Sequence, residues 1–229
     1  MTVRDSILRI IAWNVYIGSA VKAVRAQLKN WIRQYKPEII ALMEASKMYG
    51  DLEGLGYEIV HLKPRPLRKG SQPAQGDVAL MIRNDIPIKG RYTLRLKKFW
   101  KGPKHGWVQD PKVYRWVKIK WDGVVWKIGV AHSPFGDAAR KESNNALVNW
   151  FRHTVLRRPI VLVLDANMLQ AAMEKLIADN VDADVSGHHI DLIAYKNCTL
   201  IHEKNLGKGV SDHPAMQYDM RTKRRRRVA

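Results

Sequence analysis

Short apolar runs recur along the chain and are separated by polar segments or by segments that contain glycine and proline. Runs of this kind, rich in Ile, Val and aromatic residues, predict β-strands. A turn signal, Asp122-Gly123, joins two of them as a hairpin. The predicted strands cover residues 8–15, 38–43, 57–62, 77–83, 88–96, 113–121, 124–131, 160–164, 190–194, 199–203 and 215–218.

Longer stretches with apolar residues three and four positions apart predict helices over residues 19–35, 137–156 and 169–179. In the first of these, Val24, Leu28 and Trp31 share one face, and the helix must stop before Pro37. Groups of strands interrupted by single helices favour an α/β architecture in which two sheets pack face to face with helices outside.

A chain of 229 residues with 46% hydrophobic content is long enough to bury a full core, so we predict one domain over residues 1–220. The apolar stretches are too short to span a bilayer, and the charged N-terminal segment lacks the pattern of a signal peptide. Cys198 is the only cysteine, which excludes an internal disulfide. We therefore expect an intracellular, cytoplasmic protein.

The formal net charge of +19 predicts a polyanionic partner, with nucleic acid the first candidate and an anionic membrane surface the second. Much of this charge lies in residues 221–229, a basic run that we expect to be a disordered C-terminal arm. Such an arm is also compatible with a localisation signal or a membrane tether.

A second concentration of positive charge, between residues 89 and 127, alternates with aromatic residues. This combination suits phosphate contacts together with base stacking. The alternative is a solvated strand face opposite a buried aromatic face, which the alternation over residues 114–120 favours for Trp116. Both interpretations stay open for the loop around Trp100, Lys101, Lys104 and Trp107, which we predict to bind nucleic acid.

Single polar residues of metal-ligand or proton-transfer type stand at the ends of the predicted strands. A carboxylate in such a place costs desolvation energy unless a cation or hydrogen bonds hold it. Several of them together indicate one shared, acidic site that should hold a hard divalent cation. These residues are Asn14, Glu44, His132, Asp165, Asn167 and Asp191, followed by the segment Ser211-Asp212-His213.

Taken one at a time, these residues have simpler interpretations. Asn14 alone is typical of a turn, Glu44 of an exposed acid, and Asp165 of the N-cap of the next predicted helix. The adjacent His188 and His189 do not make a metal pair, because neighbouring residues on a strand point to opposite faces. The recurrence of such residues at successive strand ends is what favours a common site.

In their order along the chain, these residues resemble the motifs of the endonuclease/exonuclease/phosphatase superfamily. The resemblance runs from about residue 8 to residue 214, and the order of the motifs is more specific than any one of them. The segment VAHSPFGDA around His132 is most similar to the pancreatic deoxyribonuclease-like branch. Met43 stands where the family commonly has glutamine, and no carboxylate partner for His132 is identifiable over residues 57–76.

The resemblance implies a four-layered α/β sandwich of two packed mixed β-sheets flanked by helices, with the site at one end of the sheets. It implies that Glu44 holds Mg²⁺ or Mn²⁺, helped by Asn14 and Asp212. It further implies roles for the other residues. Asp165 or His213 would activate water, Asn167 would bind the phosphate, Asp191 would pair with His213, and His132 would contact the phosphate or protonate the leaving oxygen. Arg115 is a candidate phosphate contact on the same grounds.

We therefore predict a monomeric, metal-dependent phosphodiesterase that hydrolyses nucleic acid, with a DNA endonuclease or exonuclease as the first candidate and RNA as the alternative substrate. One alternative within the same fold is a phosphatase or phosphodiesterase acting on a phospholipid or another small phosphoester. Another is a catalytically idle nucleic-acid-binding protein. The basic segments favour nucleic acid over a small phosphoester, and the retained acidic residues favour an enzyme over a binding protein.

Overall fold

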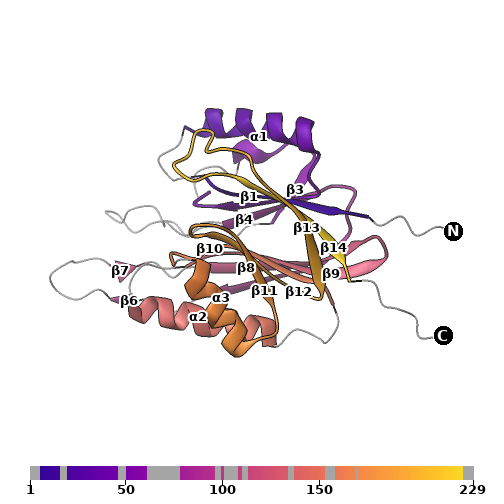
Figure 1. Cartoon of the computed structure of the whole chain (residues 1–229). Helices are drawn as coiled ribbons and strands as arrows, with labels where there is room; N and C mark the ends of the chain where they lie inside the picture. Colours follow the sequence, from indigo (N-terminus) through magenta and orange to yellow (C-terminus); the bar gives the residue numbers. More distant parts are fainter. Residues whose placement is uncertain are drawn as a thin grey trace, which may run out of the picture.

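A computed structural model describes the chain over residues 6–15, 20–45, 50–60, 78–95, 99–100, 108–109, 113–133, 137–152, 158–168 and 170–223. Two six-stranded mixed sheets pack face to face, and helices cover their outer faces. Figure 1 shows the resulting four layers, with α1 (Val21–Tyr35) on the first sheet and α2 (Asp137–Arg152) and α3 (Gln170–Asn180) on the second. The predicted four-layered α/β sandwich is therefore confirmed.

The first sheet combines strands from both ends of the chain. Its strand order is β13-β14-β1-β2-β4-β3, with β1 and β2 parallel and the other pairs antiparallel. The C-terminal strand therefore lies beside the N-terminal one. The bounds are β1 (Leu8–Asn14), β2 (Ile39–Met43), β3 (Tyr57–Val60), β4 (Val78–Arg83), β13 (Cys198–Asn205) and β14 (Met216–Thr222).

The second sheet also has one parallel pair near its centre. Its order is β11-β12-β10-β9-β8-β5, in which β9 and β10 run parallel and the other pairs are antiparallel. The parallel pairs matter for function, because parallel strands bring their carboxyl ends to the same edge of a sheet. The bounds are β5 (Ile88–Arg95), β8 (Val113–Trp121), β9 (Val124–His132), β10 (Ile160–Asp165), β11 (Asp184–His188) and β12 (Asp191–Lys196).

The helices bury their apolar faces on the two sheets. Helix α1 (Val21–Tyr35) covers the first sheet with Val24, Leu28 and Trp31, and Lys36 ends it in the left-handed conformation before Pro37. Helices α2 (Asp137–Arg152) and α3 (Gln170–Asn180) cover the second sheet. A short 3₁₀ helix, η1 (Gly50–Leu52), lies near α1. None of the helices in the described ranges is long and apolar enough to cross a membrane.

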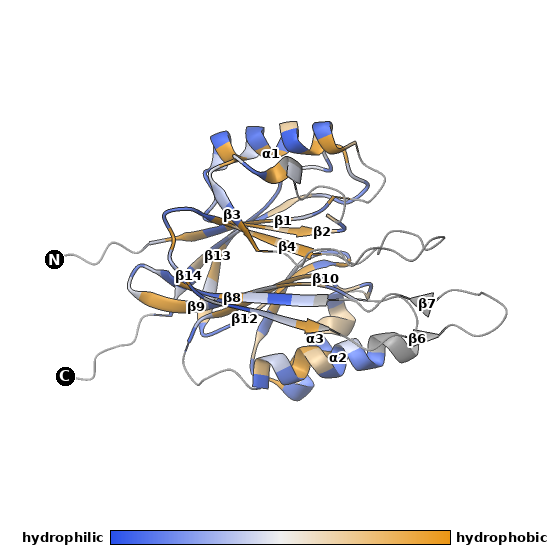
Figure 2. Ribbon diagram, turned by 180° about the vertical axis from the view of Figure 1, so that it is seen from behind, coloured by the Kyte–Doolittle hydropathy of each residue, from blue (hydrophilic) through white to orange (hydrophobic). Residues whose placement is uncertain are grey.

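The core forms three apolar layers between the four layers of secondary structure. The middle layer joins the inner faces of the two sheets through residues such as Ile10, Val117 and Val163. The outer layers lie beneath α1 and beneath α2 and α3. Figure 2 shows orange over much of strands such as β1, β2 and β4, whereas the helices alternate between orange and blue. The apolar runs in the sequence thus correspond to strands buried on both faces.

The structure differs from the predicted elements in a few places. Strand β11 (Asp184–His188) was not predicted, because its residues are polar or small and lack an apolar alternation. The predicted loop around residue 100 contains two short paired strands, β6 (Phe99–Trp100) and β7 (Val108–Gln109). Strand β14 continues to Thr222, so Arg221 pairs with β13 and belongs to the domain rather than to the basic arm. Residues 224–229 lie outside the described part of the chain.

Candidate functional site

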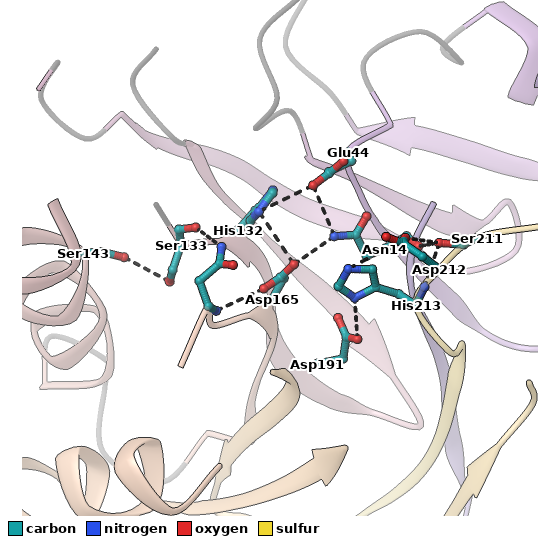
Figure 3. A network of polar contacts seen from close by, with 11 residues as sticks. Asn14, Glu44, His132, Ser133, Ser143, Asp165, Asp191, Ser211, Asp212 and His213 are labelled. Atoms are coloured by element: carbon teal, nitrogen blue, oxygen red, sulfur yellow. Dashed lines mark hydrogen bonds and ion pairs between the residues drawn. The ribbon is translucent and has the colours of Figure 1, made fainter. Parts of the chain in front are cut away.

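The register of the strands brings the predicted polar residues to one end of the two sheets. In the first sheet Asn14 ends β1, and Glu44 directly follows the neighbouring strand β2. In the second sheet Asp165 ends β10, and it pairs with His132 of β9 on one side and with Asp191 of β12 on the other. Figure 3 shows these side chains pointing toward one another between the sheets.

Asn14 connects the two sheets. Its Nδ2 donates to Asp165 Oδ2 at 2.8 Å and to Glu44 Oε1 at 3.5 Å, and its side chain is fully buried. A turn residue would be exposed and would make local contacts, so the simpler interpretation of Asn14 is wrong. The amide instead holds two carboxylates that come from different sheets.

His132 lies between the same two carboxylates. Its Nε2 is 3.8 Å from Glu44 Oε1 and 3.7 Å from Asp165 Oδ2, and only 1% of the residue is exposed. These distances suit an ion pair but are too long for hydrogen bonds. The carboxylates near His132 therefore come from the ends of β2 and β10. Most of the segment 57–76, in which no carboxylate partner for His132 is identifiable from the sequence, lies outside the described residues.

Asp165 is a buried carboxyl group with an unusual proton affinity. Burial raises its pKa to about 6, and the negative charge of Asp191 adds to this effect. Hydrogen bonds from the Asn14 amide and from the backbone N–H of Asn167 act in the opposite direction. Asp165 is thus a carboxylate at neutral pH that gains a proton just below it.

His213 and Asp191 form a hydrogen-bonded pair, as the resemblance implied. Nδ1 of His213 is 2.8 Å from Asp191 Oδ2, and this bond is the main reason that the pKa of His213 rises to about 9. The second oxygen of Asp191, Oδ1, is buried and has no hydrogen-bond partner among the described residues. The site therefore contains a protonated imidazole at neutral pH. Beside it lies a carboxylate of which one oxygen, among the described residues, has no hydrogen-bond partner.

The segment that carries His213 is anchored to β1. Ser211 Oγ donates to the carbonyl oxygen of Asn14 at 2.6 Å and accepts from the backbone N–H of His213 at 3.1 Å. Nε1 of Trp13 donates to the carbonyl oxygen of His213 at 3.3 Å. These contacts hold His213 against β1, the strand that carries Asn14. They also give Ser211 a positioning role that was not predicted from the sequence.

Asn167 is held by the backbone of the second sheet. Its φ of 48° lies in the left-handed region, which asparagine adopts more readily than most residues. Its Nδ2 donates to the carbonyl oxygen of Ser133 at 2.5 Å. Ser133 Oγ in turn accepts from Ser143 Oγ of α2 at 3.1 Å, and Ser143 contacts the hydroxyl of Tyr114. This chain of hydroxyls could not be predicted, since a serine within a helix has no characteristic sequence pattern.

Among the described residues, two groups could hold a metal ion. One oxygen or nitrogen from each of Asp165, Asp191 and His213 lies within 4.8 Å of the others. In this group, however, Nδ1 of His213 already bonds to Asp191, so an ion would have to displace that contact. The predicted group contains the neighbours Asn14 and Glu44 together with Asp212, whose side chain is 60% exposed and lies 3.9 Å from Nε2 of His213.

The predicted nucleic-acid contacts lie mostly outside the described residues. This applies to Lys101, Lys104, Trp107 and the side chain of Trp100, whose backbone belongs to β6. Arg115 is described and is 1% exposed, on β8 next to Val130 of β9. An arginine with this burial reaches the inner face of the sheet rather than a solvated surface.

The fold is that of the endonuclease/exonuclease/phosphatase proteins. An endonuclease/exonuclease/phosphatase from Bacteroides vulgatus matches with a TM-score of 0.75 at 15% identity, over 95% of this chain and 100% of the other. D. rerio TDP2 complexed with single strand DNA product matches with a TM-score of 0.71 at 14% identity, over 95% and 100%. A mannosyl-6-phosphatase from Bacteroides thetaiotaomicron matches with a TM-score of 0.72 at 14% identity, over 93% and 99%.

No family model matches the sequence, and no curated protein matches it. The similarity to solved structures is therefore one of fold. The particular resemblance to the pancreatic deoxyribonuclease-like branch stays a prediction.

Proposed function

We propose that the protein is a metal-dependent phosphodiesterase that hydrolyses nucleic acid, with DNA as the expected substrate. The observation that carries this proposal is the meeting of the two parallel strand pairs at one end of the sheets. Their ends place Asn14, Glu44, His132 and Asp165 together, and Asp191 and His213 complete the cluster. Proteins of this fold include a TDP2 with single-stranded DNA product, which supports nucleic acid as the substrate class.

The two raised pKa values divide the roles of Asp165 and His213. With a pKa of about 6, Asp165 is ionised at neutral pH and is suited to accept a proton from an attacking water. With a pKa of about 9, His213 is already protonated and is suited to contact the phosphate as a cation or to donate a proton. Asp165 is therefore the better candidate for the base, and His132 stands close enough to it to contact the same phosphate.

The residues fit a divalent cation. Within the described part of the chain, the cluster contains more carboxylates than cationic groups, and one buried oxygen of Asp191 has no hydrogen-bond partner. Glu44, with Asn14 and Asp212, would supply the oxygen ligands that Mg²⁺ and Mn²⁺ prefer. When bound, such an ion neutralises charge on the phosphate and stabilises the transition state of its hydrolysis.

The net charge of +19 supports a polyanion over a small neutral or singly charged phosphoester. The mannosyl-6-phosphatase among proteins of this fold supports the alternative, a small phosphomonoester. A panel of substrates separates the two. The panel contains supercoiled plasmid, linear duplex, single-stranded DNA, RNA and sugar phosphates, each incubated with Mg²⁺, with Mn²⁺ and with excess EDTA.

We expect hydrolysis of DNA that requires the divalent cation and stops with EDTA. Glu44→Gln should abolish it, whereas the matched variant Glu58→Gln, which changes an exposed glutamate on β3, should retain it. Full hydrolysis in excess EDTA would overturn the metal dependence. Hydrolysis of sugar phosphates alone would replace nucleic acid by the small-phosphoester alternative, and binding of DNA without any hydrolysis would leave the catalytically idle alternative.

A further inference from the structure

A second concave site lies on the helix side of the second sheet, away from the polar cluster. It is a cavity of about 500 Å³ between the outer faces of β5, β8 and β9 and the C-terminal half of α2. Lys127, which lines it, precedes His132 by five residues on β9, so at about 3.3 Å per residue the two are roughly 17 Å apart. The cavity is therefore separate from the proposed catalytic site.

Aromatic rings form the walls of this cavity, among them those of Tyr92, Trp116 and Trp150. Tyr92 and Trp116 stack with their centroids 5.6 Å apart and their planes 9° apart, and Trp150 of α2 meets Trp116 edge-on at 6.2 Å. Tyr92 is 38% exposed, which is unusual for a large aromatic residue on a sheet that a helix covers. Flat, partly exposed aromatic surfaces of this kind stack well with planar ligands.

Cationic side chains surround the rings. Nζ of Lys118 lies 5.0 Å from the ring centre of Tyr92, and Nζ of Lys127 lies 3.8 Å from that of Trp150. Arg158 lines the cavity as well. Burial lowers the pKa of Lys127 to about 8, and the charge of Lys118 contributes to this shift. Among the described residues that line the cavity, none carries a carboxylate, so its charge is complementary to an anion.

We propose that this cavity binds one nucleotide unit of a single-stranded nucleic acid. The base would stack on the face of Tyr92 that points away from Trp116, which holds the tyrosine ring in place from its other side, and the phosphate would pair with Lys118 and Arg158. A volume of about 500 Å³ lies within the range of small-molecule sites and accommodates one nucleotide. A single strand is required because the bases of a duplex are stacked on one another and are not available to aromatic side chains.

This inference rests on the proposed function, because it assigns a second anchoring point for the same class of substrate. A strand held in the cavity would be fixed at a distance from the bond that is cleaved. The site should therefore contribute to substrate binding and leave the chemical step unchanged.

The test is the binding of a fluorescent single-stranded 12-mer of thymidine in EDTA, measured by anisotropy. Trp116→Leu removes a wall, and the double variant Lys118→Gln/Arg158→Gln removes two cations but keeps the aromatic walls. The matched control is Lys120→Gln/Lys29→Gln, which removes the same charge from exposed positions that do not line the cavity. We expect each cavity variant to weaken binding at least about fivefold, the scale of losing one base stack, and the control to weaken it less than twofold.

A second ligand separates stacking from charge. An abasic strand of the same length keeps the phosphates but has no bases, so Trp116→Leu should not weaken its binding, whereas the double variant should. An equal loss on both strands for Trp116→Leu would overturn the stacking role. If the cavity variants and the charge control lost equal binding affinity, the cavity would contribute only nonspecific electrostatic attraction, and the proposal would be overturned. Thymidine monophosphate is added as a competitor. If it displaced the strand completely at equal concentration, the occupant of the cavity would be a free mononucleotide, and the proposal would be overturned.

Cleavage assays keep this proposal distinct from the proposed function. With Mg²⁺ and saturating strand, the cavity variants should cleave at the rate of the unmodified protein. Binding with the expected variant pattern but without cleavage would overturn the proposed function and leave the cavity proposal standing. Cleavage with unchanged binding in the cavity variants would overturn the cavity proposal alone.

Discussion

The two ends of β1 differ in how the carboxylates near them are paired. At the first end, Arg9 bonds to both carboxylate oxygens of Asp219 at 2.7 and 2.8 Å, and Arg83 bonds to Glu38 at 2.7 Å. At the other end, the carboxylates of Glu44 and Asp165 face the side-chain amide of Asn14. The groups beside them are imidazoles, such as that of His132 near Asp165. Among the described residues, guanidinium groups thus match the carboxylates at one end, whereas carboxylates outnumber cationic groups at the other end.

This difference indicates that the two ends serve different purposes. Ion pairs with complementary geometry hold the strands together and need nothing from outside. A buried carboxylate without a cation costs stability, and proteins retain such groups mainly at functional sites. The comparison supports the proposal that a cation binds at the Asn14 end, and it can be tested by changing one end at a time.

The largest expected difference is in turnover. Asp165→Asn and His213→Ala should each reduce the rate of hydrolysis by at least about a hundredfold, the usual scale for acid–base groups. The matched change at the opposite end, Asp219→Asn, should lower stability but keep turnover within about threefold, because Asp219 touches only Arg9 and Gln217 in the contacts described. Single-turnover rates under saturating substrate measure both. Near-normal rates for Asp165→Asn and His213→Ala together would place the active site elsewhere.

Stability should respond with opposite signs at the two ends. Arg9→Met leaves Asp219 without its partner and should lower the free energy of unfolding by about 2 kcal/mol. Asp165→Asn in EDTA removes a carboxylate that burial destabilises, and should raise the free energy of unfolding by about 1–2 kcal/mol at pH 8.

The second effect should depend on pH in a defined direction. Because the pKa of Asp165 rises from 3.8 to about 6 on folding, its destabilising effect is present above pH 6 and disappears as the pH falls toward 4. Urea denaturation at pH 4.5, 6 and 8 measures this trend. A loss of stability in Asp165→Asn at pH 8 would contradict the proposed excess of negative charge.

A divalent cation should raise the free energy of unfolding by binding at the Asn14 end of β1 only. At a concentration ten times its dissociation constant, Mg²⁺ should raise the free energy of unfolding by about 1.4 kcal/mol. Glu44→Gln should lose this increase, whereas Asp85→Asn, which changes the exposed partner of Arg83, should keep it. Thermal unfolding at several Mg²⁺ concentrations gives the result. An equal increase in both variants would show that the ion acts elsewhere.

The smallest effect is expected from the basic tail. Removing residues 224–229 deletes four arginines and leaves β14 intact. Each lost phosphate contact lowers the salt slope of duplex binding by about 0.9, so we expect a decrease of roughly one to three units with unchanged turnover at saturation. Binding isotherms over a salt series measure the slope. An unchanged slope would mean that the tail does not contact nucleic acid, and a collapsed rate would mean that it reaches the active site.

Much of the fold and of the site could be predicted, because both depend on the same local signal. An apolar run buried on both faces is recognisable, and a polar residue at its end stands out against it, as Asp165 does after β10. The register of β9, β10 and β12 then aligns His132, Asp165 and Asp191 in one row. Their recurrence at successive strand ends predicted that they converge, whereas the strand order that brings them together is known only from the structure.

The features that could not be predicted depend on contacts distant in sequence. The neighbours of His132 come from two different sheets, and the hydroxyl chain from Tyr114 to Ser133 runs through α2. Strand β11 forms by pairing with β12 and not through its own composition. Its Gly187 has a φ of 138° and lies so near the carbonyl oxygen of Asp191 that a Cβ there would be at 2.4 Å. No pattern within residues 184–188 signals this close approach.

The position of β14 has a consequence for the order in which the protein folds. This strand comes from the end of the chain but lies inside the first sheet, between β13 and β1. Contacts such as Arg9 with Asp219 and Ser211 with Asn14 therefore span about two hundred residues. At roughly 5–20 residues per second, a ribosome needs about 10 s or more to proceed from β1 to β14. Until then β1 exposes an unpaired edge, so the nascent chain must be protected from pairing with other strands before its own last strand arrives.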